Sequence, residues 1–243
     1  MQKISLRTHL KNNKNSFQQA KPFPHIVIDN FLSLEHAKSL AKTFDLDRIR
    51  NSKNGWEHFT NQNADRHRLE DEHYMEEDLK QFARLTNSRY FILFLEELTE
   101  LNSLIGDPYF MGGGAMASER GGYLNMHIDY NWNAKLQLFR NLNFLIYLTE
   151  GWEEEWGGAL DLYCEETKQR KSVIPFFNRA IIFQSDSKSY HGQPLKLNCP
   201  KDKARTLFSS FYYSSKKLDS VNDDPHFTIY KQENSPMAMS LKL

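Results

Sequence analysis

The chain has 243 residues, of which 40% are hydrophobic and 13% aromatic, so it can build one domain with a sizeable core. Its 31 basic and 31 acidic residues cancel, which argues against a charged surface for nucleic acid or anionic membranes. No apolar stretch is long enough to span a membrane, and residues 1–20 lack the core of a signal peptide. The two cysteines, Cys164 and Cys199, make no disulfide framework, so we expect a cytoplasmic protein with reduced thiols.

The first part of the chain predicts an arm, a strand and a helix. Residues 1–20 are polar and basic and indicate a loosely ordered N-terminal arm. The alternation in residues 24–32 predicts a strand, and Ser33 is the expected N-cap of a helix that ends near Phe44. Residues 46–74 are polar and predict a long loop with short elements, which is a candidate substrate lid.

Two helical patterns follow, over about residues 75–86 and 89–104, and the second has an apolar stripe suited to packing on a sheet. We therefore expect residues 21–108 to form a helical support. Residues 109–215 have a β pattern of short strands and turns, and residues 216–243 form a polar C-terminal extension. Helices followed by strands are the order expected of a jelly roll with a helical layer, although periodicity alone does not separate it from another β-sandwich.

Residues 131–140 contain Trp132 and several polar groups and predict a loop. The short strands include residues 141–149, whose alternation divides them between two faces. The even positions are all apolar and are expected to pack under the helices, whereas Asn143, Leu145 and Tyr147 suit a barrel lumen. In the extension, His226 to Tyr230 is a β-like patch that we expect to cover a sheet edge or the mouth of the site.

The most informative stretch is residues 121–129, which contains His127 and Asp129. In a strand, residues i and i+2 point to the same face, so this pair offers one nitrogen and one carboxylate donor to a single metal ion. The tripeptide alone is weak, because a histidine hydrogen-bonded to a nearby aspartate on a sheet has the same pattern.

Two residues downstream strengthen the metal hypothesis. His191 follows an apolar run. Arg205 lies 14 residues after His191 and begins a further strand-like segment. Two histidines and one carboxylate with open positions form the ligand set of non-haem Fe(II) oxygenases. An arginine on a neighbouring strand suits a carboxylate-bearing co-substrate, because its planar fork binds carboxylates through two hydrogen bonds.

At this point the chain resembles the 2-oxoglutarate/Fe(II)-dependent dioxygenases, specifically the prolyl 4-hydroxylase-like branch. The resemblance covers roughly residues 22–215 and rests on motifs in the family's order. These are His127-Ile-Asp129, Arg140-Asn-Leu-Asn-Phe-Leu-Ile-Tyr147, Trp156-Gly157-Gly158, Phe177-Asn178-Arg179, Ser189-Tyr-His191-Gly and Arg205-Thr-Leu.

The resemblance implies a double-stranded β-helix over residues 21–215, with Fe(II) held by His127, Asp129 and His191. It further implies 2-oxoglutarate as co-substrate, O2 as oxidant, and hydroxylation of an unactivated C–H bond with succinate and CO2 as co-products. Arg205 is expected to bind the 5-carboxylate of 2-oxoglutarate. Tyr147, which matches the family motif and faces the predicted lumen, is a candidate to donate a hydrogen bond to the same carboxylate. Ser209, on the same strand face as Arg205 by alternation, is a further candidate. No catalytic side chain is expected beyond the metal ligands, and relatives often use ascorbate.

Two residues argue against particular subgroups of this family. Asp129 argues against the halogenating relatives, which have a small residue there, and Phe211 stands where nucleic-acid demethylases have a second arginine. The gap between His191 and Arg205 is long for this branch and predicts a loop, so the reach of Arg205 is a point for the structure to test.

Three functions remain open from the sequence. The first is hydroxylation of a C–H bond in a peptide or protein, with a prolyl residue as the candidate target. The second is the same chemistry on a small metabolite, such as a free amino acid or a sugar. The third is a jelly-roll module whose metal is inert. Neither nucleic acid nor a membrane is an expected partner, and the oligomeric state is open.

Overall fold

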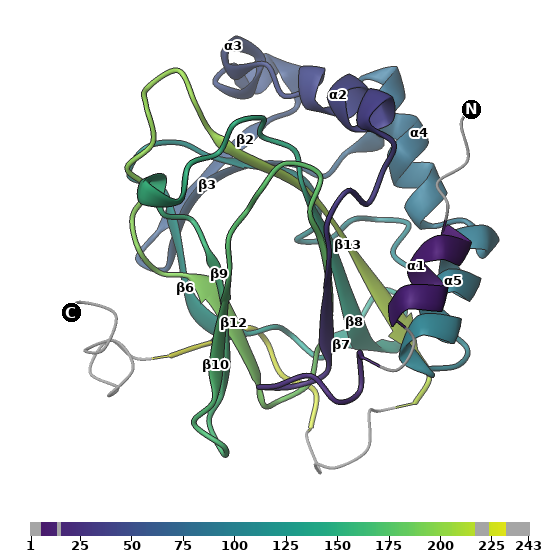
Figure 1. The fold of residues 1–243 in the computed structure, drawn as a ribbon. Coiled ribbons are helices and arrows are strands. Elements are labelled where there is room, and N and C mark those ends of the chain that lie inside the picture. Colours follow the sequence, from purple (N-terminus) through teal and green to yellow (C-terminus); the bar gives the residue numbers. More distant parts are fainter. Residues whose placement is uncertain (1–5, 14–15, 217–223, 232–243) are drawn as a thin grey trace.

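The computed structural model describes residues 6–13, 16–216 and 224–231, in which a helical layer covers one side of a curved β-sheet (Figure 1). The α-helices are α1 (Leu6–Asn13), α2 (Leu34–Lys42), α3 (Leu46–Ile49), α4 (Glu77–Thr86) and α5 (Arg89–Thr99). The strands are β1 (His25–Ile28), β2 (Glu57–Asn61), β3 (Ala64–Leu69), β4 (Ile105–Gly106), β5 (Gly114–Ser118), β6 (Tyr123–Ile128), β7 (Trp132–Asn133), β8 (Leu138–Tyr147), β9 (Leu160–Cys164), β10 (Arg170–Val173), β11 (Ala180–Gln184), β12 (Ser189–Gln193), β13 (Arg205–Ser214) and β14 (Ile229–Tyr230).

The strands pair antiparallel in the order β1-β11-β8-β13-β5-β3-β6-β12-β9-β10, with β2, β4, β7 and β14 attached at the sides. Many strands that are neighbours in the sheet are far apart in the sequence. The sheet curls into a nearly closed barrel (Figure 1). The predicted fold class, a mainly β jelly roll with supporting helices, is confirmed.

The main core lies between the helices and the outer face of the sheet. Phe31, Phe91 and Phe144 pack there with ring centroids 5.0 to 6.2 Å apart. Ser33 caps α2 by accepting a hydrogen bond from the backbone of His36, as the sequence predicts. Burial of these aromatic rings, with the aliphatic side chains around them, holds the helical layer on the sheet.

Two sequence expectations in the N-terminal half are wrong. The polar arm contains helix α1, because Leu6 and the following Phe17 are buried against the core. Residues 46–74 contain short elements, as expected, but they are not a loop: β2 and β3 form a hairpin, and β3 pairs with both β5 and β6 in the main sheet. This segment therefore forms part of the barrel wall.

Two further segments are more regular than expected. The predicted loop at 131–140 contains β7 and the first residues of β8. In the C-terminal extension, β14 pairs with β6, with Tyr230 opposite His127, so the expected cover over a sheet edge is present. Residues 217–223 and 232–243 of that extension lie outside the described residues.

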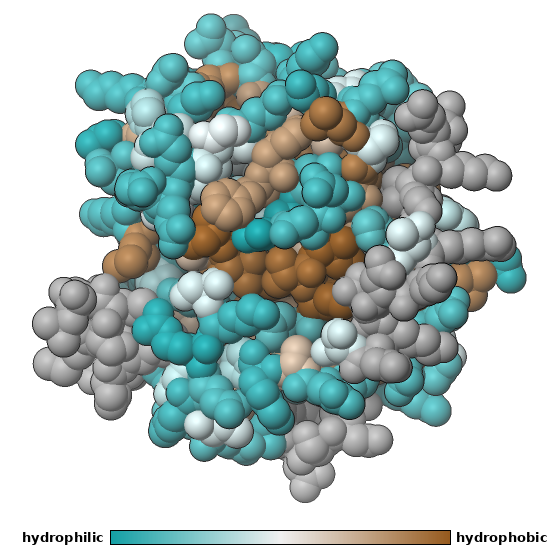
Figure 2. Space-filling view, in the orientation of Figure 1, coloured by the Kyte–Doolittle hydropathy of each residue, from teal (hydrophilic) through white to brown (hydrophobic). Residues whose placement is uncertain are grey.

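The surface seen in Figure 2 is mostly hydrophilic, with hydrophobic side chains gathered near the middle of the face. None of the described helices combines the length and apolar character needed to cross a membrane. Cys164 and Cys199 are both buried and free.

Candidate metal centre and its pocket

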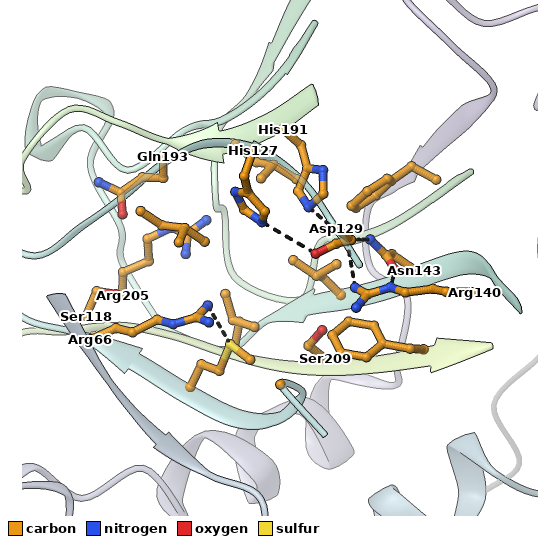
Figure 3. Close-up of a pocket in the computed structure, with 18 residues that line it drawn as sticks. Arg66, Ser118, His127, Asp129, Arg140, Asn143, His191, Gln193, Arg205 and Ser209 are labelled. Atoms are coloured by element: carbon orange, nitrogen blue, oxygen red, sulfur yellow. Dashed lines mark hydrogen bonds and ion pairs between the residues drawn. The ribbon is translucent and has the colours of Figure 1, made fainter. Parts of the chain in front are cut away.

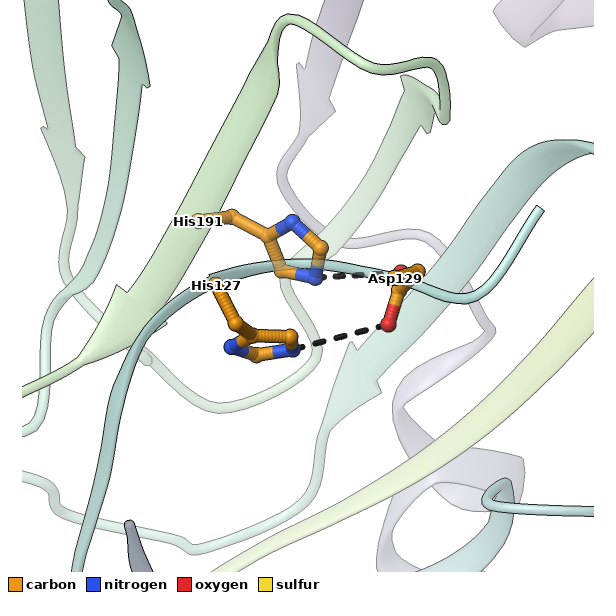
Figure 4. Close-up of side chains that lie close together, drawn as sticks. All are labelled: His127, Asp129 and His191. Atoms are coloured by element: carbon orange, nitrogen blue, oxygen red, sulfur yellow. Dashed lines mark ion pairs between the residues drawn. The ribbon is translucent and has the colours of Figure 1, made fainter. Parts of the chain in front are cut away.

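Neighbouring strands bring the three predicted metal ligands together. His127 lies on β6 directly opposite His191 on β12, and their ring centroids are 4.4 Å apart. Asp129 follows the end of β6, and all three side chains are buried and point toward one another (Figure 4). One nitrogen or oxygen atom from each lies within 4.8 Å of the others. Residues 62 positions apart in the chain therefore meet at one point.

The hydrogen bonds of the two imidazoles fix which nitrogen faces that point. His127 Nδ1 lies 2.8 Å from the backbone oxygen of Asn125, and His191 Nδ1 lies 3.0 Å from that of Ser189. A carbonyl oxygen only accepts, so each Nδ1 carries the proton and each Nε2 keeps a free lone pair. These Nε2 atoms are 3.5 and 3.2 Å from the two carboxylate oxygens of Asp129.

The protonation states of this cluster suit a divalent metal. Burial lowers the pKa of His127, with His191 adding to the effect, and this favours the neutral imidazole that binds metals. Burial alone would raise the pKa of Asp129, but Arg140 and the histidines hold it well below its ordinary value. Two neutral nitrogens and one carboxylate beside an open pocket fit the donor set of non-haem Fe(II).

Asp129 is held by two side chains of β8. Arg140 Nη2 lies 2.7 Å from Asp129 Oδ2, and Asn143 donates from Nδ2 to the same oxygen at 2.8 Å. Arg140 also donates from Nε to Asn143 Oδ1 at 2.9 Å, and its guanidinium stacks 3.4 Å from the centroid of Phe211. The carboxylate therefore has a fixed orientation, which is the usual role of groups behind a metal ligand. The sequence contained Arg140 as the start of a motif but gave no indication of this role.

Arg205 lies in the same pocket, at the start of β13. It is 6% exposed, donates from Nε to the backbone oxygen of Gly158 at 2.7 Å, and donates from Nη2 to the hydroxyl of Tyr147 at 3.3 Å. Gly158 has a φ of +80°, and a Cβ there would lie 3.0 Å from Arg205 Cδ, so glycine permits this close approach.

Arg205 and Tyr147 both retain hydrogen-bonding capacity. Among the described residues, no carboxylate forms an ion pair with Arg205, and burial lowers the pKa of its guanidinium. The Tyr147 hydroxyl accepts from Arg205, so its own proton remains available, and burial raises its pKa. Ser209, the weaker sequence candidate, lines the pocket on the same strand face as Arg205.

The long segment between His191 and Arg205 is tied back to the barrel. Leu197 N donates to Gly122 O at 3.1 Å, and Gly121 N donates to Leu197 O at 2.8 Å. Leu197 also packs with Cys199 and Trp152 in a small buried cluster. The extra residues therefore form a compact loop and leave Arg205 inside the pocket.

One pocket joins these groups and contains a residue that the sequence gave no reason to include (Figure 3). The polar residues that line it are Arg66, Ser118, His127, Asp129, Arg140, Asn143, His191, Gln193, Arg205 and Ser209. The apolar lining includes Leu145, Leu160, Phe183 and Leu207. Arg66 comes from β3, inside the segment expected to be a loop, so only the strand pairing brings it here.

Comparison with known proteins agrees with this geometry. Residues 113–217 match the family described as the 2OG-Fe(II) oxygenase superfamily. A stretch of 79 residues is 29% identical to prolyl 3-hydroxylase OGFOD1 of Mus musculus. This stretch is 30% of this chain but only 14% of that protein.

Solved structures share the fold at low identity. A prolyl-4-hydroxylase from Pseudomonas putida has a TM-score of 0.60 at 14% identity, covering 86% of this chain and 100% of that one. A prolyl hydroxylase from Trichoplax adhaerens, in complex with a hypoxia inducible factor peptide fragment, has a TM-score of 0.58 at 18% identity, covering 88% and 94%.

The class of protein follows from the fold, the site and these matches together. The predicted resemblance to the 2-oxoglutarate/Fe(II)-dependent dioxygenases is confirmed, because residues 113–217 match that superfamily. The predicted enzyme class, a dioxygenase, is also confirmed. Prolyl hydroxylases recur among the similar proteins.

Proposed function

We propose that this chain is an Fe(II)- and 2-oxoglutarate-dependent hydroxylase that acts on a prolyl residue of a peptide or protein and forms succinate and CO2. The observation that carries the proposal is the union of His127, Asp129 and His191 with the unpaired Arg205 in one buried pocket. The prolyl hydroxylases among the similar proteins support the substrate class, and one of them is bound to a peptide.

In this proposal His127, Asp129 and His191 would hold Fe(II), and the pocket beside them leaves room for further ligands. Bound Fe(II), together with 2-oxoglutarate and O2, supplies the oxidising chemistry that hydroxylates an unactivated C–H bond. Arg140 and Asn143 keep the Asp129 carboxylate oriented toward the two Nε2 atoms. The chain's contribution at this end of the pocket is a fixed, desolvated set of donors.

Arg205 and Tyr147 bind the 5-carboxylate of 2-oxoglutarate in this proposal, and Ser209 is a further candidate contact. The backbone of Gly158 fixes the Arg205 fork, and the Tyr147 proton supplies an additional donor. The apolar side chains of Leu160, Phe183 and Leu207 exclude water around the co-substrate, which strengthens these charge-assisted hydrogen bonds.

Anaerobic titration with Fe(II) and 2-oxoglutarate tests the chemistry directly. We expect a charge-transfer absorption band in the visible region for the wild type. His127→Ala should abolish the band, and Arg205→Ala should weaken the apparent 2-oxoglutarate affinity by about tenfold or more, because a charge-assisted carboxylate contact is removed. His58→Ala and Arg179→Ala are matched controls, since neither lines the pocket and Arg179 pairs with Asp29.

A wild-type protein that binds the metal but shows no band would contradict the oxygenase proposal and favour the inert metal-binding module. The substrate class is tested separately with proline-containing peptides and with free amino acids and sugars. We expect a peptide to gain one oxygen atom at proline, detected by mass spectrometry, with equimolar succinate. Turnover of only a small metabolite would overturn the peptide part of the proposal.

Three further features belong to the same proposal. Residues 21–215 form the catalytic unit, with residues 1–20 and 216–243 as its extensions. The protein works in the reducing cytoplasm, which is consistent with its two free, buried cysteines. Ascorbate serves as a reductant that maintains Fe(II), and its effect is tested by comparing turnover with and without it.

A further inference from the structure

The pocket contains more positive charge than the proposed metal and co-substrate require. Arg66, Arg140 and Arg205 line it together with a single carboxylate, Asp129. Asp129 is already paired with Arg140. Fe(II) and the 2-oxoglutarate dianion carry equal and opposite charges. Binding of both therefore leaves the excess positive charge of the arginines unchanged.

Arg66, like Arg205, has no carboxylate partner among the described residues, and it also lacks the hydrogen bonds that hold Arg205 in place. Its Nε is buried and makes no hydrogen bond, and its Nη1 has only the weak acceptor Met116 Sδ at 3.3 Å. No carboxylate of the described residues forms an ion pair with it. A partly buried guanidinium whose Nε is buried and which has no counter-ion is unfavourable, so a position of this kind suits a ligand that supplies an anion.

Arg66 lies on a different side of the metal centre from Arg140 (Figure 3). Its strand, β3, is separated from the Arg205 strand, β13, by β5, which pairs with both. Strand β3 also pairs with β6 on the same edge as β14, which carries Tyr230. The Tyr230 ring centroid is 5.5 Å from that of His127. Burial lowers the pKa of Arg66, and the nearby Tyr230 hydroxyl partly opposes this by raising it. Arg66 therefore faces the pocket close to the metal.

The co-substrate does not account for this residue. 2-Oxoglutarate has two carboxylates. Arg205 and Tyr147 match the 5-carboxylate in the proposed function, and the metal centre would take the other. A single guanidinium with no lysine beside it in the lining suits a carboxylate, whose two oxygens match its planar fork.

We propose that Arg66 anchors a carboxylate of the substrate that is hydroxylated, so that the substrate is an acid whose charged group lies next to the reacting carbon. This inference rests on the proposed function and narrows its substrate class. The carboxylate has two sources, an acidic side chain or terminus next to the target residue of a peptide, or the acid group of a small molecule.

The first test uses acetate as a minimal carboxylate probe and needs no turnover. The unfolding midpoint of the Mn(II)-loaded protein is measured in acetate and in chloride at equal ionic strength, with and without saturating 2-oxoglutarate. Acetate should stabilise the wild type and Arg68→Gln but not Arg66→Gln. Arg68 is the matched control, because it lies two residues along β3 and is already paired with Glu57 and Glu70.

An equal response of the wild type and Arg66→Gln would overturn the anchor. The affinity for 2-oxoglutarate is measured in the same variants and should change in Arg205→Gln but not in Arg66→Gln. A loss in Arg66→Gln as large as that in Arg205→Gln would assign Arg66 to the co-substrate and also overturn the inference. Failure of 2-oxoglutarate binding in the wild type would instead contradict the proposed function. Acetate titration of Arg205→Gln and of the double variant Arg66→Gln/Arg205→Gln would then still report on Arg66.

The second test identifies the source of the carboxylate. Two acid and amide pairs are titrated into the loaded protein: N-acetyl-L-proline with its amide, and a proline peptide followed by glutamate with the glutamine peptide. The acid of one pair should bind about tenfold or more tightly than its neutral partner in the wild type. Arg66→Gln should remove this difference and Arg66→Lys should restore part of it. Equal binding of acid and amide in both pairs would contradict the proposal.

Discussion

The ten residues of strand β8 form two faces, one that packs against the helices and one that contacts the candidate site. On the outer face, Leu142, Phe144 and Ile146 are fully buried beneath the helices. On the inner face, Asn143 and Tyr147 are equally buried but contact Asp129 and Arg205. The outer face contributes packing, which tolerates no polar group, whereas the inner face contributes oriented hydrogen bonds. Substitutions on the two faces should therefore change different measurable quantities.

The largest expected effect is on folding, from Phe144→Ala on the outer face. The Phe144 ring lies 5.0 Å from that of Phe91 and 5.4 Å from that of Phe31, so its loss leaves a cavity in the main core. The free energy of unfolding should fall by about 3–5 kcal/mol, measured by urea denaturation. The metal affinity of the protein that remains folded should not change.

Phe227→Ala is the control for this substitution, because Phe227 is 91% exposed. Its free energy of unfolding should stay within about 0.5 kcal/mol of the wild type. A comparable loss in both variants would mean that the outer face of β8 is not the principal packing surface.

Arg140→Gln on the inner face should chiefly reduce metal affinity. Its guanidinium lies 2.7 Å from Asp129 Oδ2, and removal of a group that orients a metal ligand costs about 10- to 100-fold in affinity. Competition with a chelator for Mn(II) measures this loss, and Arg140→Lys should recover part of it. Unchanged metal affinity in Arg140→Gln would show that Asn143 alone suffices to hold Asp129.

Simple alternation predicts much of this comparison from the sequence. Period two in residues 141–149 correctly assigns the apolar positions to the helical layer. It also puts Asn143 and Leu145 in the pocket lining and Tyr147 on the inner side of the sheet, where it packs with Leu160 and Leu207. The same rule correctly puts Arg205 and Ser209 on one strand face. These residues are predictable because regular strands divide side chains between two faces without help from distant contacts.

Alternation fails where the pairing is irregular. Leu142 is opposite Tyr212 and Arg140 is opposite Tyr213, so Asn141 forms a bulge that turns Arg140 to the inner face. Arg66 was missed for another reason: β3 has charged residues on both faces, so its sequence lacks the apolar alternation of a strand. Both positions are decided by neighbours that lie far along the chain.

Tyr147→Phe should give the smallest effect, because it removes one hydroxyl from the inner face. That hydroxyl accepts from Arg205 at 3.3 Å and keeps its own proton for the 2-oxoglutarate carboxylate, so affinity for the co-substrate should fall by roughly 2- to 10-fold. The charge-transfer titration measures this change. Tyr212→Phe is the matched control, because its buried hydroxyl donates to Thr86 O at 2.9 Å within the helical layer. Tyr212→Phe should lower stability slightly and leave co-substrate affinity unchanged, and equal losses of affinity in both variants would contradict the division of the barrel into a packing face and a binding face.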